Sequence, residues 1–419
     1  MQAATSPPGL VSQLQLDGWI VVEGLFSVDS PIARKGWNVD FSWTEEQLGL
    51  RKEVIKFAQQ ELNDNLIERD CHEVFSYENW KKCAAFGLLG LPIPEQYGGT
   101  GQDILTTVVA LEALGYGCRD NGLIFSLNAH MWSSEIPLLM FGTEEQKNRY
   151  LPKLVNGEWI GVHAMTEPMS GSDAYNLRTR VEKKGDRYVI NGSKTFITNG
   201  PNADLVIVFA TSDPGKGPSG ISGFIVEKGT KGFSVSRKLH KMGLRTSPMA
   251  ELGFVDCEIP AENLLGKEGG GPAIFTASME WERTCILASH IGAMQRLLET
   301  CTRYAKERKQ FGQPIGKFDA IAGKIADMDV RLETARLVLY KAAWLKKTGR
   351  HALREASIAK LYVSEACVAT CRDALQIHGG YGYMTEYEIE RELRDAMAGT
   401  IYSGTSEIQK VIIAGLQGI

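Results

Sequence analysis

The sequence predicts an α+β protein in which a helical segment is followed by a small β segment and then by a second helical segment. From about residue 43 to 160, apolar residues recur with the spacing of amphipathic helices. From about 161 to 266 the chain has short runs rich in β-branched residues, which are typical of strands. From 273 onward the helical spacing returns. We therefore expect three domains, at 39–161, 162–270 and 271–419.

The first segment has apolar residues on one helical face and then a break. Val54, Phe57, Ala58 and Leu62 recur at helical spacing. The stretch "GLLGLPIPEQYGGTG" (87–101) is rich in Pro and Gly, which end regular structure. More helix is expected on both sides of this break.

The β segment contains a predicted hairpin and two short strands. "RYVINGSKTFIT" (187–198) predicts the hairpin, because Asn191-Gly192 is the strongest short turn signal. "ADLVIVFAT" and "SGFIVEK" are branched apolar runs of strand length. "GKEGGGP" (266–272) then predicts a hinge before the helices return.

The second helical segment carries the seam of an antiparallel helical bundle. Its apolar residues are spaced 4-3-4-3-4 along one stretch: Ile321, Ile325, Met328, Leu332, Ala335 and Leu339.

Composition excludes several classes of function. The chain has 419 residues, enough for about two to four domains and a substantial core. Its net charge of −4 gives no indication of nucleic-acid binding, and no apolar run has the roughly 18 residues of a membrane helix. The eight cysteines have no C-x-x-C pair, so we expect no metal site and no disulfides, with Cys367 and Cys371 as packed thiols. This pattern is typical of a reduced, cytoplasmic protein.

The first 38 residues differ from the rest. They include Pro7-Pro8, and their basic residues are Arg34 and Lys35, whereas a transit peptide is rich in Arg and poor in acids. The globular pattern begins at Val39. We expect 1–38 to be a leader, a tag or upstream read-through.

Polar motifs interrupt this scaffold. "AMTEPMSGSDAYNL" (164–177) groups hydroxyls, glycine and acids, and by composition it is a polar turn or a concave binding loop. "KTFITNG" (194–200) places Phe196 two residues from Thr198, on one face of a strand. "HGGYG" lacks the G-x-G-x-x-G spacing of a dinucleotide fingerprint, so His378 is expected to be a packed or loop histidine.

A last motif, "TIYSGTSEIQ" (400–409), runs directly into a helix. Ser406 is expected to cap this helix, with Gln409 reaching back as in a capping box. An apolar stripe, Ile408, Ile412 and Leu416, continues the helix.

Taken in order, these motifs resemble the acyl-CoA dehydrogenase family from about residue 40 to the end. The resemblance is carried by "AMTEPMSGSD", "KTFITNG", "RKQFGQPIG", "QIHGGYGY" and "RDAMAGTIYSGTSEIQ". It implies an N-terminal helical domain, a middle small β-barrel domain and a C-terminal four-helix bundle. It also implies bound FAD and a homotetramer in which a neighbouring subunit holds part of each FAD.

The resemblance assigns roles to particular residues. Met165, Thr166 and Ser172 would line the flavin, with Ser172 also near the acyl tail, while Phe196 and Thr198 would contact the isoalloxazine. The remaining implied cofactor contacts are Arg308, Gln310, Phe311, Gln376, Gly379, Gly380, Thr405 and Glu407. Such a cofactor needs an aromatic side chain against its ring, hydrogen-bond donors at the edge of the ring and a cation beside its phosphates.

The residue after Tyr402 differs from the one that most of the family has at this position. Most of the family has a glutamate there, which removes the proton α to the thioester carbonyl, whereas this chain has Ser403. A minority has the glutamate just before an arginine on another helix, which matches Glu282-Arg283. By composition alone Glu282 is an exposed helix acid; the resemblance makes it the base and places Arg283, Tyr402 and Ser403 at the substrate.

Asn176 after the "GSD" motif, with "SMEWER" and "IYSGTSEIQ", is most similar to the branch that oxidises prolyl groups on a peptidyl carrier protein. That branch makes building blocks of bacterial secondary metabolites, antibiotics among them. The expected reaction introduces an α,β or Cα–N double bond into a thioester. The first alternative function is isovaleryl-type acyl-CoA oxidation. Two further alternatives are flavin-dependent oxygenation and a non-catalytic binding role. Electrons would pass to electron-transferring flavoprotein or to oxygen.

Overall fold

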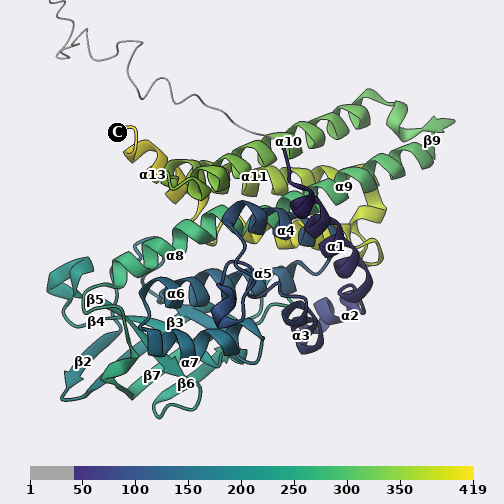
Figure 1. The fold of residues 1–419 in the computed structure, drawn as a ribbon. Coiled ribbons are helices and arrows are strands. Elements are labelled where there is room, and N and C mark those ends of the chain that lie inside the picture. Colours follow the sequence, from purple (N-terminus) through teal and green to yellow (C-terminus); the bar gives the residue numbers. More distant parts are fainter. Residues whose placement is uncertain (1–41) are drawn as a thin grey trace, which may run out of the picture. The chain divides into compact units, whose positions relative to one another are not determined.

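The computed structural model describes residues 42–419 (Figure 1). The predicted leader at 1–38 and the predicted start at Val39 lie outside these residues. Residues Glu45–Ile419 form one compact unit. Its order of elements, helices, then strands, then helices, confirms the predicted fold class.

The first part is helical, as predicted. Val54, Ala58 and Leu62 are fully buried, and 87–101 is irregular apart from the short turn Glu95–Tyr97. Its α-helices are α1 (Glu45–Glu61), α2 (Leu66–His72), α3 (Tyr77–Ala85), α4 (Ile104–Gly117), α5 (Asn121–His130), α6 (Ile136–Phe141) and α7 (Glu144–Val155).

The middle part is a sheet with the strand order β6-β7-β3-β2-β4-β5-β8. An eighth strand, β1, pairs with β4 in parallel. Its strands are β1 (Gly161–Ala164), β2 (Arg180–Lys184), β3 (Arg187–Thr198), β4 (Leu205–Thr211), β5 (Ile221–Glu227), β6 (Phe233–Lys238), β7 (Met249–Pro260) and β8 (Leu264–Leu265).

The predicted hairpin turn at Asn191-Gly192 is wrong. β3 continues through both residues, and its pairing with β7 slips between Ile190 and Gly192, which is a β-bulge. The turn lies instead at Gly185, between β2 and β3, where φ is 60°. A Cβ on Gly192 would come within 2.5 Å of Thr179 Oγ1. This glycine therefore permits close approach of β3 to Thr179, the residue before β2, and not a chain reversal.

β4 joins the sheet to the helices because it is buried on both faces. Leu205, Ile207 and Phe209 belong to the core that the sheet shares with the helices. The alternate residues Val206 and Val208 belong to a second core inside the β part. Successive strand residues point to opposite faces, so one strand serves both cores.

The last part is a helical bundle, as predicted. Met328, Leu332, Ala335 and Leu339 of the predicted seam are buried, while Ile321 and Ile325 pack half-buried against the same core. Figure 1 shows the long helices side by side, with a small strand pair at one end. The elements are α8 (Gly271–Cys285), α9 (Ala288–Glu307), β9 (Lys309–Gln310), β10 (Gln313–Pro314), α10 (Asp319–Lys347), α11 (Leu353–His378), α12 (Ile389–Ala398) and α13 (Ser406–Gly415).

Two glycines bring α4 and α9 into close contact. A Cβ on Gly115 would lie 2.0 Å from the Ser289 carbonyl oxygen, and one on Gly292 would lie 2.0 Å from the Glu112 carbonyl oxygen. Such distances exclude any side chain at either position unless the helices separate. The first and last helical parts are thus packed backbone to backbone.

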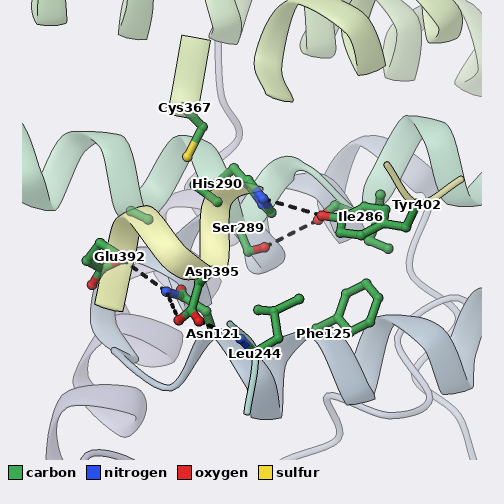
Figure 2. A pocket seen from close by; sticks show the side chains of 12 residues that line it. Asn121, Phe125, Leu244, Ile286, Ser289, His290, Cys367, Glu392, Asp395 and Tyr402 are labelled. Atoms are coloured by element: carbon green, nitrogen blue, oxygen red, sulfur yellow. Dashed lines mark hydrogen bonds between the residues drawn. The ribbon is translucent and has the colours of Figure 1, made fainter. Parts of the chain in front are cut away.

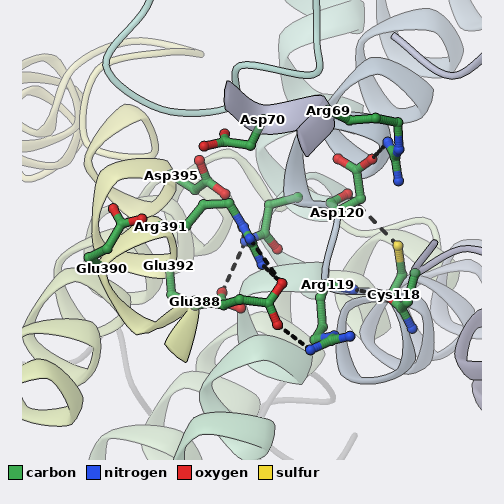
Figure 3. Close-up of polar contacts among 12 residues, drawn as sticks. Arg69, Asp70, Cys118, Arg119, Asp120, Glu388, Glu390, Arg391, Glu392 and Asp395 are labelled. Carbon is green, nitrogen blue, oxygen red and sulfur yellow. Dashed lines mark hydrogen bonds and ion pairs between the residues drawn. The ribbon is translucent and has the colours of Figure 1, made fainter. Parts of the chain in front are cut away.

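A polar network ties the first helices to α12 (Figure 3). Arg394 donates to Asp70 across 2.7 Å, Arg119 pairs with Glu388, and Arg69 pairs with Asp120. The pairs of Asp70 and Asp120 are largely buried, so removing one partner would leave an uncompensated charge. The network fixes the position of α12, from which the chain enters the segment before α13.

Cys367 and Cys371 are buried free thiols, as predicted. None of the helices between residues 42 and 419 combines the length and the apolar character that a membrane span needs.

Candidate active site

A cavity of about 520 Å³ lies between the sheet and the second helical part. Its walls come from α5, from β1 and the segment after it, from the end of β3, from α8, and from Tyr402 to α13.

This cavity brings together every predicted residue of the flavin ring and the substrate. They are Met165, Thr166, Ser172, Phe196, Thr198, Glu282, Arg283, Tyr402 and Ser403. The roles assigned to them stay predictions, but their convergence from four separate segments is a property of the fold. Asn176 is exposed and does not line the cavity, and its Nδ2 donates to Asp173 Oδ2 across 3.0 Å.

The end of β3 presents an aromatic ring to the cavity through a backbone irregularity. The β3–β7 register slips between Lys194 and Ile197, and Phe196 has a φ of 57°. Phe196 is 62% exposed, a large value for an aromatic ring. Phe196 and Thr198 do line one cavity, as predicted, but across a bulge rather than along a regular strand.

A buried ion pair fastens the segment after β1 beneath β3. Lys194 Nζ lies 2.7 Å from Glu167 Oε1 and also donates to the Met165 carbonyl across 3.0 Å. Glu167 in turn accepts backbone N–H bonds from Arg178 and Thr179. Burial opposes ionisation of Glu167, but the Lys194 charge and these hydrogen bonds lower its pKa overall. The residues predicted to contact the flavin edge are therefore on a fixed support.

Glu282 and Ser403 meet in the cavity wall. The Ser403 hydroxyl donates a hydrogen bond to Glu282 Oε1. Burial raises the pKa of Glu282, while this hydrogen bond and the charges of Arg283 and Lys360 act in the opposite direction. A carboxylate with a raised pKa is a stronger base at neutral pH. The serine that replaces the usual acid is thus a hydrogen-bond partner of the acid on α8.

Ser403 is itself held in the left-handed region, with a φ of 56°. Its carbonyl oxygen accepts from Arg283 Nε across 3.0 Å and from Gln409 Nε2 across 3.2 Å. These two bonds come from α8 and α13, so both helices determine where the Ser403 hydroxyl points.

The predicted capping role of Ser406 is wrong. Thr405 is the N-cap of α13, and its hydroxyl accepts from the Ile408 N–H across 3.3 Å. Ser406 is buried and donates to Glu365 Oε1 on α11 across 2.5 Å. Gln409 reaches back, but to the carbonyls of Ser403 and Gly404. α13 therefore begins one residue earlier than expected, against the cavity.

A second, more open hollow of about 620 Å³ lies at the far end of the bundle. Arg308, Gln310, Gly379 and Gly380, all predicted cofactor contacts, line it. Leu353, at one end of α11, lines the first cavity, whereas the other end of α11 lines this hollow. At 1.5 Å per residue α11 is about 39 Å long, and Figure 1 shows β9 and α13 at opposite ends of the bundle.

Four predicted cofactor contacts line neither space in the described structure. Phe311 lies in the β9–β10 turn with a φ of 51° and is 93% exposed. Gln376 and Glu407 are exposed, and Thr405 caps α13. Within one chain these residues have no shared site.

Sequence reasoning missed several residues of the cavity. One of them is His163, which lies on β1 two residues before Met165 and lines the cavity. Because alternate strand residues share a face, the position of Met165 could have indicated it. Burial lowers the pKa of His163 to about 3, so the imidazole is neutral. Its ring contacts Phe209 and Phe275, with centroids 4.9 and 5.7 Å away. Phe275, with Met279 further along α8, makes this wall apolar.

A small cavity of about 20 Å³ lies behind Tyr402 (Figure 2). Tyr402 Oη is 3.3 Å from His290 Nε2, and the Tyr402 ring packs on Phe125 at a centroid distance of 4.7 Å. Burial lowers the pKa of His290 to about 4 and raises that of Asp395, on the opposite wall, to about 7. The space suffices for one water molecule. Tyr402 is thus supported by polar groups that do not reach the main cavity.

The donor set of the main cavity fits a flavin. An exposed aromatic face is available at Phe196, and hydroxyl groups for the polar edge of the ring are available at Thr166 and Thr198. The described residues contain no group of three or more His, Cys, Asp or Glu side chains arranged to bind a metal ion.

The chain belongs to the acyl-CoA dehydrogenase family, whose members are FAD-dependent oxidoreductases. The family's N-terminal, middle and C-terminal domain models match residues 44–158, 163–257 and 269–416. This confirms the predicted family, enzyme class and cofactor. The exact domain boundaries at 161 and 270 stay predictions.

Three similar proteins narrow the comparison. The crystal structure of the prolyl acyl carrier protein oxidase AnaB is 55% identical, with a TM-score of 0.89, and covers 90% of this chain and 100% of its own. The structure of PigA with FAD and proline is 41% identical, with a TM-score of 0.89, over 90% of this chain and 99% of its own. An acyl-CoA dehydrogenase of Bacillus subtilis is 45% identical over 88% of this chain and 97% of its own.

Proposed function

We propose that this protein is an FAD-dependent dehydrogenase of a prolyl thioester carried by a peptidyl carrier protein. The observation that supports it most is the position of Glu282. The carboxylate lines the same cavity as Phe196 and Thr198, and the Ser403 hydroxyl orients it. A base and a flavin site therefore face one substrate space.

The reaction removes two hydrogens from the substrate. Glu282 accepts the proton from Cα, and the second hydrogen leaves as a hydride, for which bound FAD supplies the acceptor. Ser403 holds the carboxylate in place, and Arg283 holds the Ser403 backbone. Phe275 and Met279 line the same cavity and would shield the reacting carbon from water.

The substrate class is supported by the comparisons and by space beside the base. AnaB acts on a prolyl group on an acyl carrier protein, and PigA binds proline together with FAD. The small side chain of Ser403 leaves room in the cavity for a ring. Electron-transferring flavoprotein or oxygen would reoxidise the flavin, in the cytoplasm.

We infer that each FAD lies between two copies of this chain, within a homotetramer. The hollow at Arg308 lies at the opposite end of α11 from Leu353, which lines the main cavity. A cation and flexible glycines suit a phosphate group. The two sets of predicted contacts can serve one cofactor if they come from different subunits, which would also cover the exposed Phe311.

A short branched-chain acyl-CoA dehydrogenase is the second candidate. The 45% identity to the Bacillus acyl-CoA dehydrogenase favours it, and a branched acyl group fits the same space.

Anaerobic mixing with a panel of substrates separates these functions. The panel is L-prolyl-carrier protein, free proline, prolyl-CoA and isovaleryl-CoA, and the flavin absorbance is followed. The proposal expects bleaching by the carrier-bound prolyl group, with prolyl-CoA much slower. Bleaching by isovaleryl-CoA alone would contradict it. Product mass then distinguishes loss of two hydrogens from gain of oxygen.

A further inference from the structure

Lys360 on α11 is a buried lysine without a hydrogen-bond partner. Its side chain is 0% exposed, and Nζ makes no hydrogen bond to any residue of 42–419. Lysine is almost never fully buried unless it is paired. Burial of an unpaired ammonium is costly, so nearby negative charge is needed to compensate it.

The lysine lies where α11 packs against α8 and α13. Five charged or titratable groups on four helices have charge interactions with Lys360. They are Glu282 and Arg283 on α8, His290 on α9, Glu365 on α11 and Glu407 on α13.

Glu365 acts more strongly on Lys360 than Glu282 does, but the acids of this junction differ in their exposure to water. Glu365 and Glu407 are exposed, so water screens their interaction with Lys360. Glu365 also already accepts a hydrogen bond from Ser406. Glu282 is half-buried in the cavity wall, where charge interactions are less screened than at the exposed surface.

The other cation at the junction, Arg283, also favours the charged form of Glu282, but it has a second task. Arg283 Nε donates to the Ser403 carbonyl and so fixes the backbone before α13. Lys360, by contrast, has no hydrogen bond that would account for its burial within the described part of the chain. Its contribution is its charge.

We propose that Lys360 is a positioning residue for catalysis, whose buried positive charge keeps Glu282 deprotonated until substrate arrives. The inference rests on the proposed role of Glu282 as the base. Burial lowers the pKa of Lys360 to about 8, so the ammonium form still predominates at pH 7. His290 is neutral at that pH and adds no competing charge.

The test is the Lys360→Met variant, purified with its FAD. Loss of a nearby positive charge disfavours the ionised form of Glu282. In a plot of the rate of flavin reduction against pH, the midpoint of the acid limb therefore moves up by about one pH unit. Below that midpoint the rate falls roughly tenfold, and well above it the rate equals that of the wild type. Lys360→Arg restores the original midpoint. Lys347→Met, which removes an exposed ammonium from α10, leaves the midpoint unchanged.

A substrate-free readout separates this proposal from the proposed function. The absorbance spectrum of oxidised flavin is titrated with pH in the wild type, in Lys360→Met and in Glu282→Gln. The titration step is expected to shift in the first variant and to vanish in the second. This result needs no particular substrate, so failure of the prolyl panel would leave it intact.

An unchanged midpoint in Lys360→Met with full FAD content would overturn the proposal. If that variant does not hold FAD, Lys360→Gln takes its place. If neither neutral variant holds FAD, the charge is needed for folding and not for the base, which also overturns the proposal.

Discussion

The two spaces that contain most of the predicted cofactor contacts differ in how complete they are. Around Glu282, a single chain supplies the proposed base, its hydrogen-bond partner and an exposed aromatic face. Around Arg308, the residues are exposed, and the neighbouring Phe311 ring is 93% exposed. Under the proposed assignment, one chain contains all the groups for proton removal, whereas at the other end it would supply only half of a cofactor site.

The largest expected effect concerns the complete space. Glu282→Gln should bind FAD but reduce it at least about 10²–10⁴ times more slowly, because the amide cannot accept the Cα proton. Stopped-flow absorbance under anaerobic conditions measures this. Glu280→Gln, on the same helix and paired with Lys346, is the matched control. Near wild-type reduction by Glu282→Gln would show that another group is the base.

The next effect concerns the incomplete space. Arg308→Ala should weaken FAD binding roughly 10- to 100-fold, because a charge-assisted contact to phosphate is lost. The oligomer should loosen in parallel, since binding and assembly are linked. Flavin content and sedimentation velocity measure the two, with the exposed Arg187→Ala as control. A variant with unchanged flavin and unchanged sedimentation would argue against a cofactor shared between subunits.

A smaller effect sharpens the picture of the base. The Ser403 hydrogen bond favours the charged form of Glu282, so Ser403→Ala should raise the pKa of that carboxyl. The acid limb of the rate profile then moves to higher pH by about one unit. Well above the midpoint the rate stays near that of the wild type. A large loss at every pH would mean that Ser403 takes part in the chemistry directly.

The smallest effect is expected outside both spaces. Asn176→Ala should change the rate less than about twofold, because the Asn176 side chain binds Asp173 on the exposed face of its loop. A marked change in the preference between carrier-bound and CoA-bound substrates would instead show that this loop meets the carrier protein.

Much of the fold could be predicted because its signals are periodic. The seam from Met328 to Leu339 and the strands at 205–211 and 221–227 follow directly from apolar spacing. The error at Asn191-Gly192 has a physical reason. The same dipeptide suits a turn and a bulge, and pairing with β7 decides between them.

The candidate site could be predicted only in part, for a related reason. Motif resemblance pointed to Glu282 and to the cavity residues that are predicted to contact the flavin. Lys360 was beyond reach, because a lysine on a helix normally indicates a solvent-exposed face, and its burial depends on α8 and α13 packing over it. The cap of α13 was misplaced because Ser406 and Thr405 are both good caps, and the contact of Ser406 with Glu365 decides between them.

Mixed oligomers test the central claim most directly, namely that two copies of this chain build one working site. Arg308→Ala and Glu282→Gln chains are co-expressed with different tags and purified through both. In a mixed pair, the intact Glu282 cavity of one chain faces the intact Arg308 of the other. We expect L-prolyl-carrier protein to reduce flavin in the mixed oligomer, although it reduces little or none in either parent oligomer. Mixed oligomers that contain both chains but no reducible flavin would contradict it.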